Sequence, residues 1–198
     1  MPTPLYRYHP VYEVDKLMLS FDNTALFEPI TFKIEPKDCL VISGDNGSGK
    51  STLLSYITGQ FNGDVQVEFE SRHPVTMSYL SQFFEFDGTI EALAETYHLD
   101  YQQVIYDVRQ LGMERKTLSH SIASMSSGER QKVAIAASLC QPADLYIWDK
   151  PLTYLDIQNQ DQLVALIQTY QPTLLLVDHN DDFVQQIKTK EVRLKAIN

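Results

Sequence analysis

The chain contains the stretch Gly44-Asp45-Asn46-Gly47-Ser48-Gly49-Lys50-Ser51, which fits the pattern G-x-x-x-x-G-K-[ST] at every position. An apolar, strand-like run precedes it at 39–43, and a helix-compatible run follows at 52–58. In such a strand–loop–helix unit, successive backbone N–H groups point inward at phosphates, and the start of the helix attracts anions. The sequence therefore predicts a nucleoside triphosphate site, formed by Gly44, Asn46, Gly47, Ser48, Gly49, Lys50, Ser51 and Thr52.

Three side chains have specific tasks in this prediction. Lys50 would place an ammonium on the phosphates, and the hydroxyl of Ser51 would ligate Mg²⁺. Asp149 ends a second apolar run, where an unpaired buried carboxylate is costly. Coordination of a magnesium ion would remove that cost, so we expect Asp149 to be a second metal ligand.

Two kinds of strand are predicted from the pattern of apolar residues. Runs that are apolar throughout are typical of strands buried on both faces of a parallel sheet, and helical spacing flanks each of them. Runs that alternate with period two are typical of antiparallel strands with one solvated face. The apolar runs are 39–42, 145–148 and 173–177, and the alternating runs are 14–19, 30–34 and 65–70.

A helical insertion is predicted between these strands. Residues 89–124 are rich in Ala, Leu, Gln and Tyr at helical intervals and contain no strand-like run. Together with the helix expected after it, this segment forms a helical subdomain over about 89–140. We therefore expect an α/β fold, organised as a single domain over 1–198.

Composition limits the class of protein further. With 43% hydrophobic and 21% charged residues in 198, the chain can form a core and is not expected to be disordered. It has no run of about 18 apolar residues and no signal-peptide pattern, so we expect a cytoplasmic protein without membrane insertion. The net charge of −10 argues against a broad basic surface for nucleic acid. Cys39 and Cys140 lack metal-ligand spacing and are expected to be buried free thiols.

A second motif, Met125-Ser126-Ser127-Gly128-Glu129-Arg130-Gln131, resembles the signature of ATP-binding cassette (ABC) proteins, commonly written LSGGQ or LSGGE. The resemblance extends over nearly the whole chain, because the other family motifs follow in order. These are the adenine-stacking aromatic (Phe21), the Q-loop glutamine (Gln82), the Walker B aspartate (Asp149), the D-loop aspartate (Asp156) and the switch histidine (His179).

The resemblance implies a fold, cofactors and residue roles. The fold would be a P-loop NTPase core with a parallel sheet, an antiparallel β-subdomain and a helical subdomain that carries the signature. ATP and Mg²⁺ would be the cofactors, with Gln82 near the metal and His179 near the reacting phosphate. Ser126, Gly128, Glu129 and Asp156 would act on the nucleotide of a second cassette, in the same polypeptide or in a homodimer.

Three of these positions also have a structural interpretation. The spacing of Ser126 and Glu129 is that of a capping box, in which the two residues satisfy each other's backbone N–H at a helix start. This interpretation is compatible with function, because a capped helix start also binds phosphate. Phe21 could stack on a base or be an ordinary aromatic at a strand end.

The chain departs from the family pattern at Lys150, where the resemblance implies a glutamate that polarises the attacking water. A protonated lysine has no acceptor and cannot serve as that base. Lys150 would instead neutralise the terminal phosphate or exclude the magnesium ion, or it marks a domain in which hydrolysis is dispensable. Ser127 is a second departure, where glycine is usual.

Two functions remain open at this stage. The sequences 125–134 and 148–156 look like the second cassette of ABC-F-type proteins, which bind the ribosome and include antibiotic-resistance factors. The alternative is the ATPase subunit of a membrane transporter, which would contact a transmembrane permease near Gln82. A pure interaction module is a third class, kept open by Lys150. The acidic charge is an obstacle to ribosome binding, because basic residues are enriched only near the end of the chain.

Overall fold

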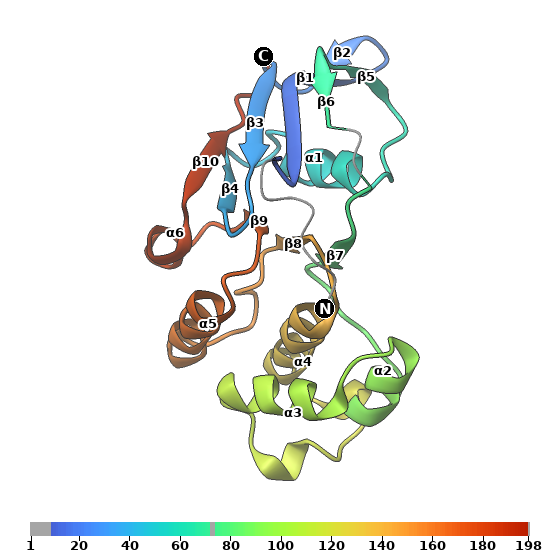
Figure 1. Ribbon diagram of the computed structural model, residues 1–198, viewed down its shortest axis with the longest axis vertical. Helices are drawn as coiled ribbons and strands as arrows, with labels where there is room; N and C mark the ends of the chain where they lie inside the picture. The colour runs from blue at the N-terminus through green and yellow to red at the C-terminus, as the bar shows by residue number, and fades with distance from the viewer. Residues whose placement is uncertain (1–8, 72–73, 198) are drawn as a thin grey trace.

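The computed structural model describes residues 9–71 and 74–197, which form a layered α/β structure (Figure 1). A parallel sheet lies in its middle, with neighbouring strands in the order β10-β4-β9-β8-β7. The predicted α/β class with a central parallel sheet is therefore confirmed. The strands of this sheet are β4 (Cys39–Ser43), β7 (Met77–Leu80), β8 (Leu145–Asp149), β9 (Leu174–Val177) and β10 (Lys190–Arg193).

The central strands of this sheet are buried on both faces. In β4, Leu40 and Ile42 pack in the core toward the antiparallel sheet, whereas Cys39 and Val41 pack in a second core with helices. Strands β8 and β9 divide their side chains between the same two cores. Because neither face meets water, the continuous apolar runs suit these positions.

An antiparallel sheet forms the second layer, as the alternating runs predict. Strand β1 (Tyr12–Phe21) pairs with β2 (Thr24–Ala25), β3 (Ile30–Ile34), β5 (Asp64–Gln66) and β6 (Phe69–Glu70). The expected continuous strand at 65–70 is wrong, because it is divided into β5 and β6. The interruption lies opposite Lys16 of β1, which has a positive φ of 50°, and the ladder between β1 and β3 shifts register at the same place.

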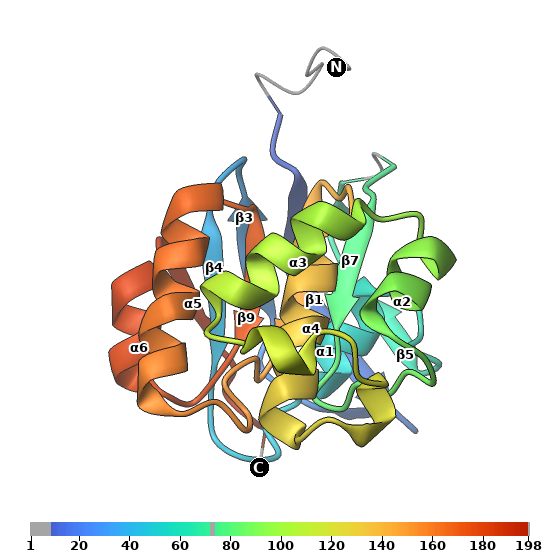
Figure 2. The same ribbon diagram turned by 90° about the horizontal axis from the view of Figure 1, so that it is seen from below.

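Helices cover both faces of the parallel sheet. Helix α1 (Lys50–Ile57) lies between the two sheets, and its Leu53 and Leu54 share a core with both (Figure 1). Helices α5 (Ile157–Tyr170) and α6 (Asp181–Ile187) pack on the opposite face (Figure 2). This layering leaves the loops at the carboxyl ends of β4, β8 and β9 along one edge, where open α/β sheets bind ligands.

A group of helices lies within 89–140. It consists of α2 (Ile90–Thr96), α3 (Tyr101–Gln110) and α4 (Ser127–Cys140), with 3-10 turns η1 (Arg115–Thr117) and η2 (Ile122–Ser124). These elements share an apolar core of their own. Both cysteines are free, but Cys140 at the end of α4 is only partly buried. Within the described residues, no helix has both the length and the apolar character needed to cross a bilayer.

Candidate nucleotide site

The phosphate loop joins β4 to α1 and requires glycine at two positions. A Cβ on Gly44 would lie 2.6 Å from Ser48 Oγ and 2.7 Å from the backbone oxygen of Leu194. Gly49 is the N-cap of α1 with a φ of 93°, and no described side chain caps this helix start. The first N–H groups of α1 are therefore available to an anion. The remaining predicted contacts lie on the loop or in the first turn of α1: Asn46, Gly47, Ser51 and Thr52.

The side chain of Lys50, which was predicted to bind phosphate, folds back into the phosphate loop. Its side chain is buried, and its Nζ donates to the backbone oxygens of Gly44 (2.7 Å) and Asp45 (2.8 Å). Burial, and next the charge of Lys150, lower the pKa of Lys50. An incoming phosphate would compete with two carbonyl oxygens for this ammonium, and a full negative charge is the stronger partner.

Buried polar atoms without a partner mark the same region. Among the described residues, Ser43 Oγ, Ser48 Oγ and Asp149 Oδ1 are buried and accept or donate no hydrogen bond. Burial raises the pKa of Asp149 above its usual range. Such groups are costly unless a ligand satisfies them. The carboxylate of Asp149 and the exposed hydroxyl of Ser51 are oxygen donors of the kind that Mg²⁺ prefers, so these residues fit a magnesium ion.

Lys150 follows Asp149 at the end of β8 and has a left-handed backbone, with a φ of 53°. Its N–H donates to the backbone oxygen of Val177 at 2.7 Å, which fixes its Cα beside the end of β9. The half-buried side chain forms no hydrogen bond or ion pair with any described residue. Its charge nevertheless lowers the pKa of both Asp149 and Lys50, so the ammonium lies at this same edge of the sheet.

His179 follows the end of β9, which is the strand that lies next to β8 in the sheet. Its backbone N–H donates to Asp178 Oδ1 at 2.8 Å, and the N–H of Asn180 donates to the same oxygen at 2.9 Å. The His179 side chain is exposed, and its charge acts on Asp149. The structure thus brings the phosphate loop, Asp149, Lys150 and His179 to one edge of the sheet.

Phe21 lies at the end of β1, beside a turn at Asp22 and Asn23 with φ values of 48° and 62°. Its ring is 45% exposed and therefore open to a planar ligand. The ring of Phe61 packs against it, with centroids 5.1 Å apart and planes tilted by 59°. Sequence reasoning missed Phe61, which lies in a loop after α1.

The signature residues form the predicted capping box at the start of α4. Ser126 Oγ accepts from the N–H of Glu129 at 3.3 Å, and Glu129 Oε2 accepts from the N–H of Ser126 at 2.8 Å. The backbone N–H and the hydroxyl of Ser126 both donate to the Glu129 carboxylate and lower its pKa. A Cβ on Gly128 would lie 2.8 Å from the backbone oxygen of Tyr154, so only glycine allows this close approach.

The D-loop, at 154–156, is held between α4 and α5. Asp156 caps α5, since its Oδ1 accepts from the N–H of Asn159 at 2.8 Å. From α4, Gln131 Nε2 donates to the backbone oxygen of Pro151 at 3.0 Å. The signature helix and the loop after β8 are therefore one connected unit.

Gln82 follows the edge strand β7, away from the phosphate loop. It is half-buried and lines a small cavity with Ser127 and Arg130 at the first turn of α4. Ser127 Oγ accepts from Arg130 Nη2 at 3.3 Å, so its hydroxyl has a partner within the chain. The structure places Gln82 beside the signature, and no described contact joins it to Asp149 or Ser51.

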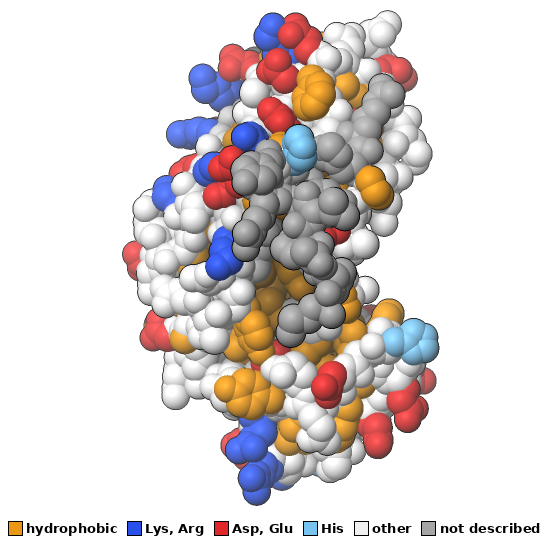
Figure 3. All heavy atoms as spheres, in the orientation of Figure 1, with side chains coloured by type: hydrophobic (Ala, Val, Ile, Leu, Met, Phe, Trp, Pro, Cys, Tyr) orange, Lys and Arg blue, Asp and Glu red, His pale blue; other side chains and the backbone are white. Residues whose placement is uncertain are grey.

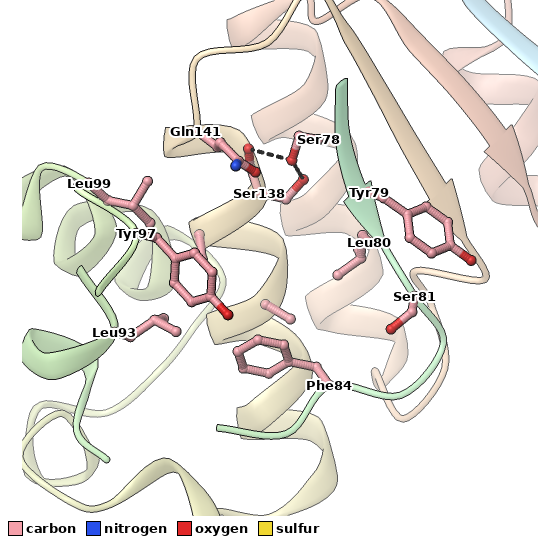
Figure 4. A pocket seen from close by; sticks show the side chains of 12 residues that line it. Ser78, Tyr79, Leu80, Ser81, Phe84, Leu93, Tyr97, Leu99, Ser138 and Gln141 are labelled. Atoms are coloured by element: carbon pink, nitrogen blue, oxygen red, sulfur yellow. Dashed lines mark hydrogen bonds between the residues drawn. The ribbon is translucent and has the colours of Figure 1, made fainter. Parts of the chain in front are cut away.

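A separate apolar hollow lies between the helical subdomain and β7. Hydrophobic side chains gather there on the face seen in Figure 3. Leu93 of α2 and Tyr97, which follows α2, line the hollow with Phe84 and Leu80, and Ser78 bonds to Ser138 of α4 (Figure 4). None of the described residues that line this hollow carries a charged side chain, so it is distinct in chemistry from the phosphate site.

Comparison with known proteins agrees with this geometry. A model of the ABC transporter family matches residues 27–153. The ribosome protection protein VmlR of Bacillus subtilis is 31% identical over 190 residues, which are 94% of this chain and 34% of VmlR. The ergothioneine transport ATP-binding protein EgtV of Helicobacter pylori is 25% identical over 94% of this chain and 98% of EgtV. The chain thus spans about a third of VmlR's length and nearly all of EgtV's.

The fold is also similar to that of solved structures. The RNase-L Inhibitor superposes with a TM-score of 0.77 over 93% of this chain and 37% of that one, at 22% identity. That identity shows a shared fold alone. The family model covers more than half of the chain. This protein therefore belongs to the ABC transporter family and is built as one of its ATP-binding cassettes.

Proposed function

We propose that this chain binds Mg²⁺-ATP at its phosphate loop, pairs with a second cassette when ATP is bound, and hydrolyses the nucleotide slowly. The uncapped start of α1, the buried ammonium of Lys50 and the unpartnered Asp149 Oδ1 support binding. Asp149 and Ser51 would hold the magnesium ion, which would neutralise phosphate charge. Phe21 would stack on the base.

Pairing with a second cassette is required because the chain carries two half-sites that do not meet. Helix α1 and the phosphate loop lie between the two sheets, whereas α4 lies on the opposite face of the parallel sheet (Figure 1). The start of α4, with Ser126 and Gly128, would bind the terminal phosphate of the nucleotide held by the partner. ATP would then join the two cassettes.

Slow hydrolysis follows from the chemistry of Lys150, the observation that distinguishes this chain. A lysine ammonium donates hydrogen bonds but cannot accept the proton of an attacking water. Loss of a general base reduces the rate by about 10²–10⁴. With a long-lived ATP state, the paired form would persist, and the protein would act through binding rather than through rapid turnover.

Ribosome association of the ABC-F type is the partner that we favour. VmlR is named as a ribosome protection protein, and its similarity extends over 94% of this chain. The second candidate is the ATPase subunit of a transporter, favoured by the match to nearly the full length of EgtV. The two functions differ in whether ribosomes or a transmembrane permease bind the paired cassettes.

Three measurements test this proposal. Isothermal titration of the full chain with Mg²⁺-ATP should give saturable binding, and Lys50→Ala should abolish it. Sedimentation with and without ATP should show that ATP converts monomer to a paired species, while Ser126→Ala and Lys50→Ala should remain monomeric. Co-sedimentation of the paired form with ribosomes supports the ABC-F assignment, and its absence contradicts it. Failure of the chain to bind ATP contradicts the proposed function as a whole.

A further inference from the structure

We propose that Lys150 is a built-in cation of the phosphate site, which lets the loop hold the triphosphate chain of a nucleotide without a divalent metal ion. This inference rests on the proposed function, since it concerns the same site. It goes beyond that function because it names Lys150 as the group that balances the negative charge of the bound phosphates.

The first support is that Lys150 and Asp149 remain unpaired although they are neighbours. The ammonium forms no ion pair with any described carboxylate, and Asp149 Oδ1 is buried without a partner. Among the charges that change the pKa of Asp149, Lys150 has the largest effect, and it lowers that pKa. Two opposite charges that lie close but do not bond are both available to a ligand.

The second support is the charge of the site as a whole. Lys50 and Lys150 supply two positive charges, and Asp149 and Asp178 supply two negative charges. Asp178 already accepts backbone N–H groups, which disperse part of its charge. The exposed Asp45 of the loop is the remaining described carboxylate that acts on Lys50. A glutamate at 150 would make the net charge of the site more negative by two elementary charges, which would repel phosphate.

The third support is that the backbone fixes the position of Lys150. Its N–H bond to Val177 and its left-handed conformation hold the Cα at the junction of β8 and β9. This Cα lies at the same edge of the sheet as the phosphate loop, which holds the ammonium of Lys50. Lys50, at the start of α1, and Lys150, directly after β8, therefore both belong to the edge of the sheet that carries the phosphate loop.

The consequence is a reduced need for magnesium. A divalent cation at such a site relieves repulsion between the aspartate and the phosphate oxygens. Lys150 is a permanent part of the protein and would supply positive charge to both the aspartate and the phosphate oxygens. Triphosphate binding should then persist when divalent metal is removed, and diphosphate should bind more weakly because it lacks the terminal phosphate that Lys150 would contact.

The test is equilibrium binding of ATP to the full chain in excess Mg²⁺ and in excess EDTA. We expect the wild-type dissociation constant to rise by less than about threefold in EDTA, and that of Lys150→Glu by more than about thirtyfold. Lys150→Gln, which removes the charge but keeps an unbranched side chain, should lie between them. Circular dichroism checks that each variant is folded.

The outcomes separate this inference from the proposed function. Binding of ATP by the wild type only in Mg²⁺ overturns the inference and leaves the proposed function intact. Equal metal dependence of the wild type and Lys150→Gln also overturns it, because the charge would then have no role. Absence of ATP binding in both buffers overturns both, and Lys50→Ala shows that the binding measured belongs to the phosphate loop.

Discussion

The hydrogen bond from Tyr170 to Asp107 ties the helical subdomain to the core, and Tyr170→Phe removes it. Asp107 of α3 is 1% exposed, and Tyr170 is the last residue of α5. The tyrosine hydroxyl donates to Asp107 Oδ1 at 2.7 Å, with further bonds from Gln103 Nε2 at 3.1 Å and Cys140 Sγ at 3.5 Å. The variant leaves the buried carboxylate without its shortest donor.

The expected loss of unfolding free energy is about 1.5–3 kcal/mol at neutral pH, the usual contribution of a hydrogen bond to a charged group. Burial raises the pKa of Asp107 despite these donors. Loss of the tyrosine would raise the folded-state pKa further, so the folded variant would bind the proton more tightly than the unfolded chain. The destabilisation should therefore be largest above that pKa and shrink as the pH falls toward the unfolded value of about 3.9.

Urea unfolding at pH 7 and pH 4 measures this difference. Tyr106→Phe is the matched control. Tyr106 is next to Asp107 on α3 and is 55% exposed, so its loss of a hydroxyl should change stability by less than about 0.5 kcal/mol. The reasoning is refuted if Tyr170→Phe costs no more than the control, or if its cost is greater at pH 4 than at pH 7.

Two further predictions concern the nucleotide site. Asp149→Asn should stabilise the nucleotide-free chain by about 1 kcal/mol in thermal unfolding, because an unpaired buried charge is removed; a less stable variant would contradict this. Gly128→Ala should weaken ATP-dependent pairing by about tenfold or more, measured by sedimentation, since its Cβ would lie 2.8 Å from Tyr154 O and displace the D-loop. Pairing equal to that of the wild type would show that this close approach is dispensable.

The central strands could be predicted because burial on both faces leaves a plain sequence pattern. The edge strands β7 and β10 could not. β10 is Lys190-Glu191-Val192-Arg193, which pairs on one side only with β4, so it retains polar residues. In β7, Ser78 is buried because it bonds to Ser138 of α4, a distant partner that no local pattern reveals.

The site could be predicted where a motif determines backbone conformation, and less well where distant segments meet. The capping box at Ser126 is local in sequence and forms as expected. The packing of Phe61 on Phe21, by contrast, brings together a loop and the end of a strand that are 40 residues apart in sequence. The requirement for glycine at 128 comes from Tyr154, on a separate segment.

The turnover of ATP by the paired chain, compared between the wild type and Lys150→Glu, tests the central claim most directly. Both should be measured under conditions in which sedimentation shows pairing, with Lys50→Ala as the background. The carboxylate can accept a proton from water, so we predict that Lys150→Glu raises turnover by about 10²-fold or more. Equal rates for the two proteins would contradict the account.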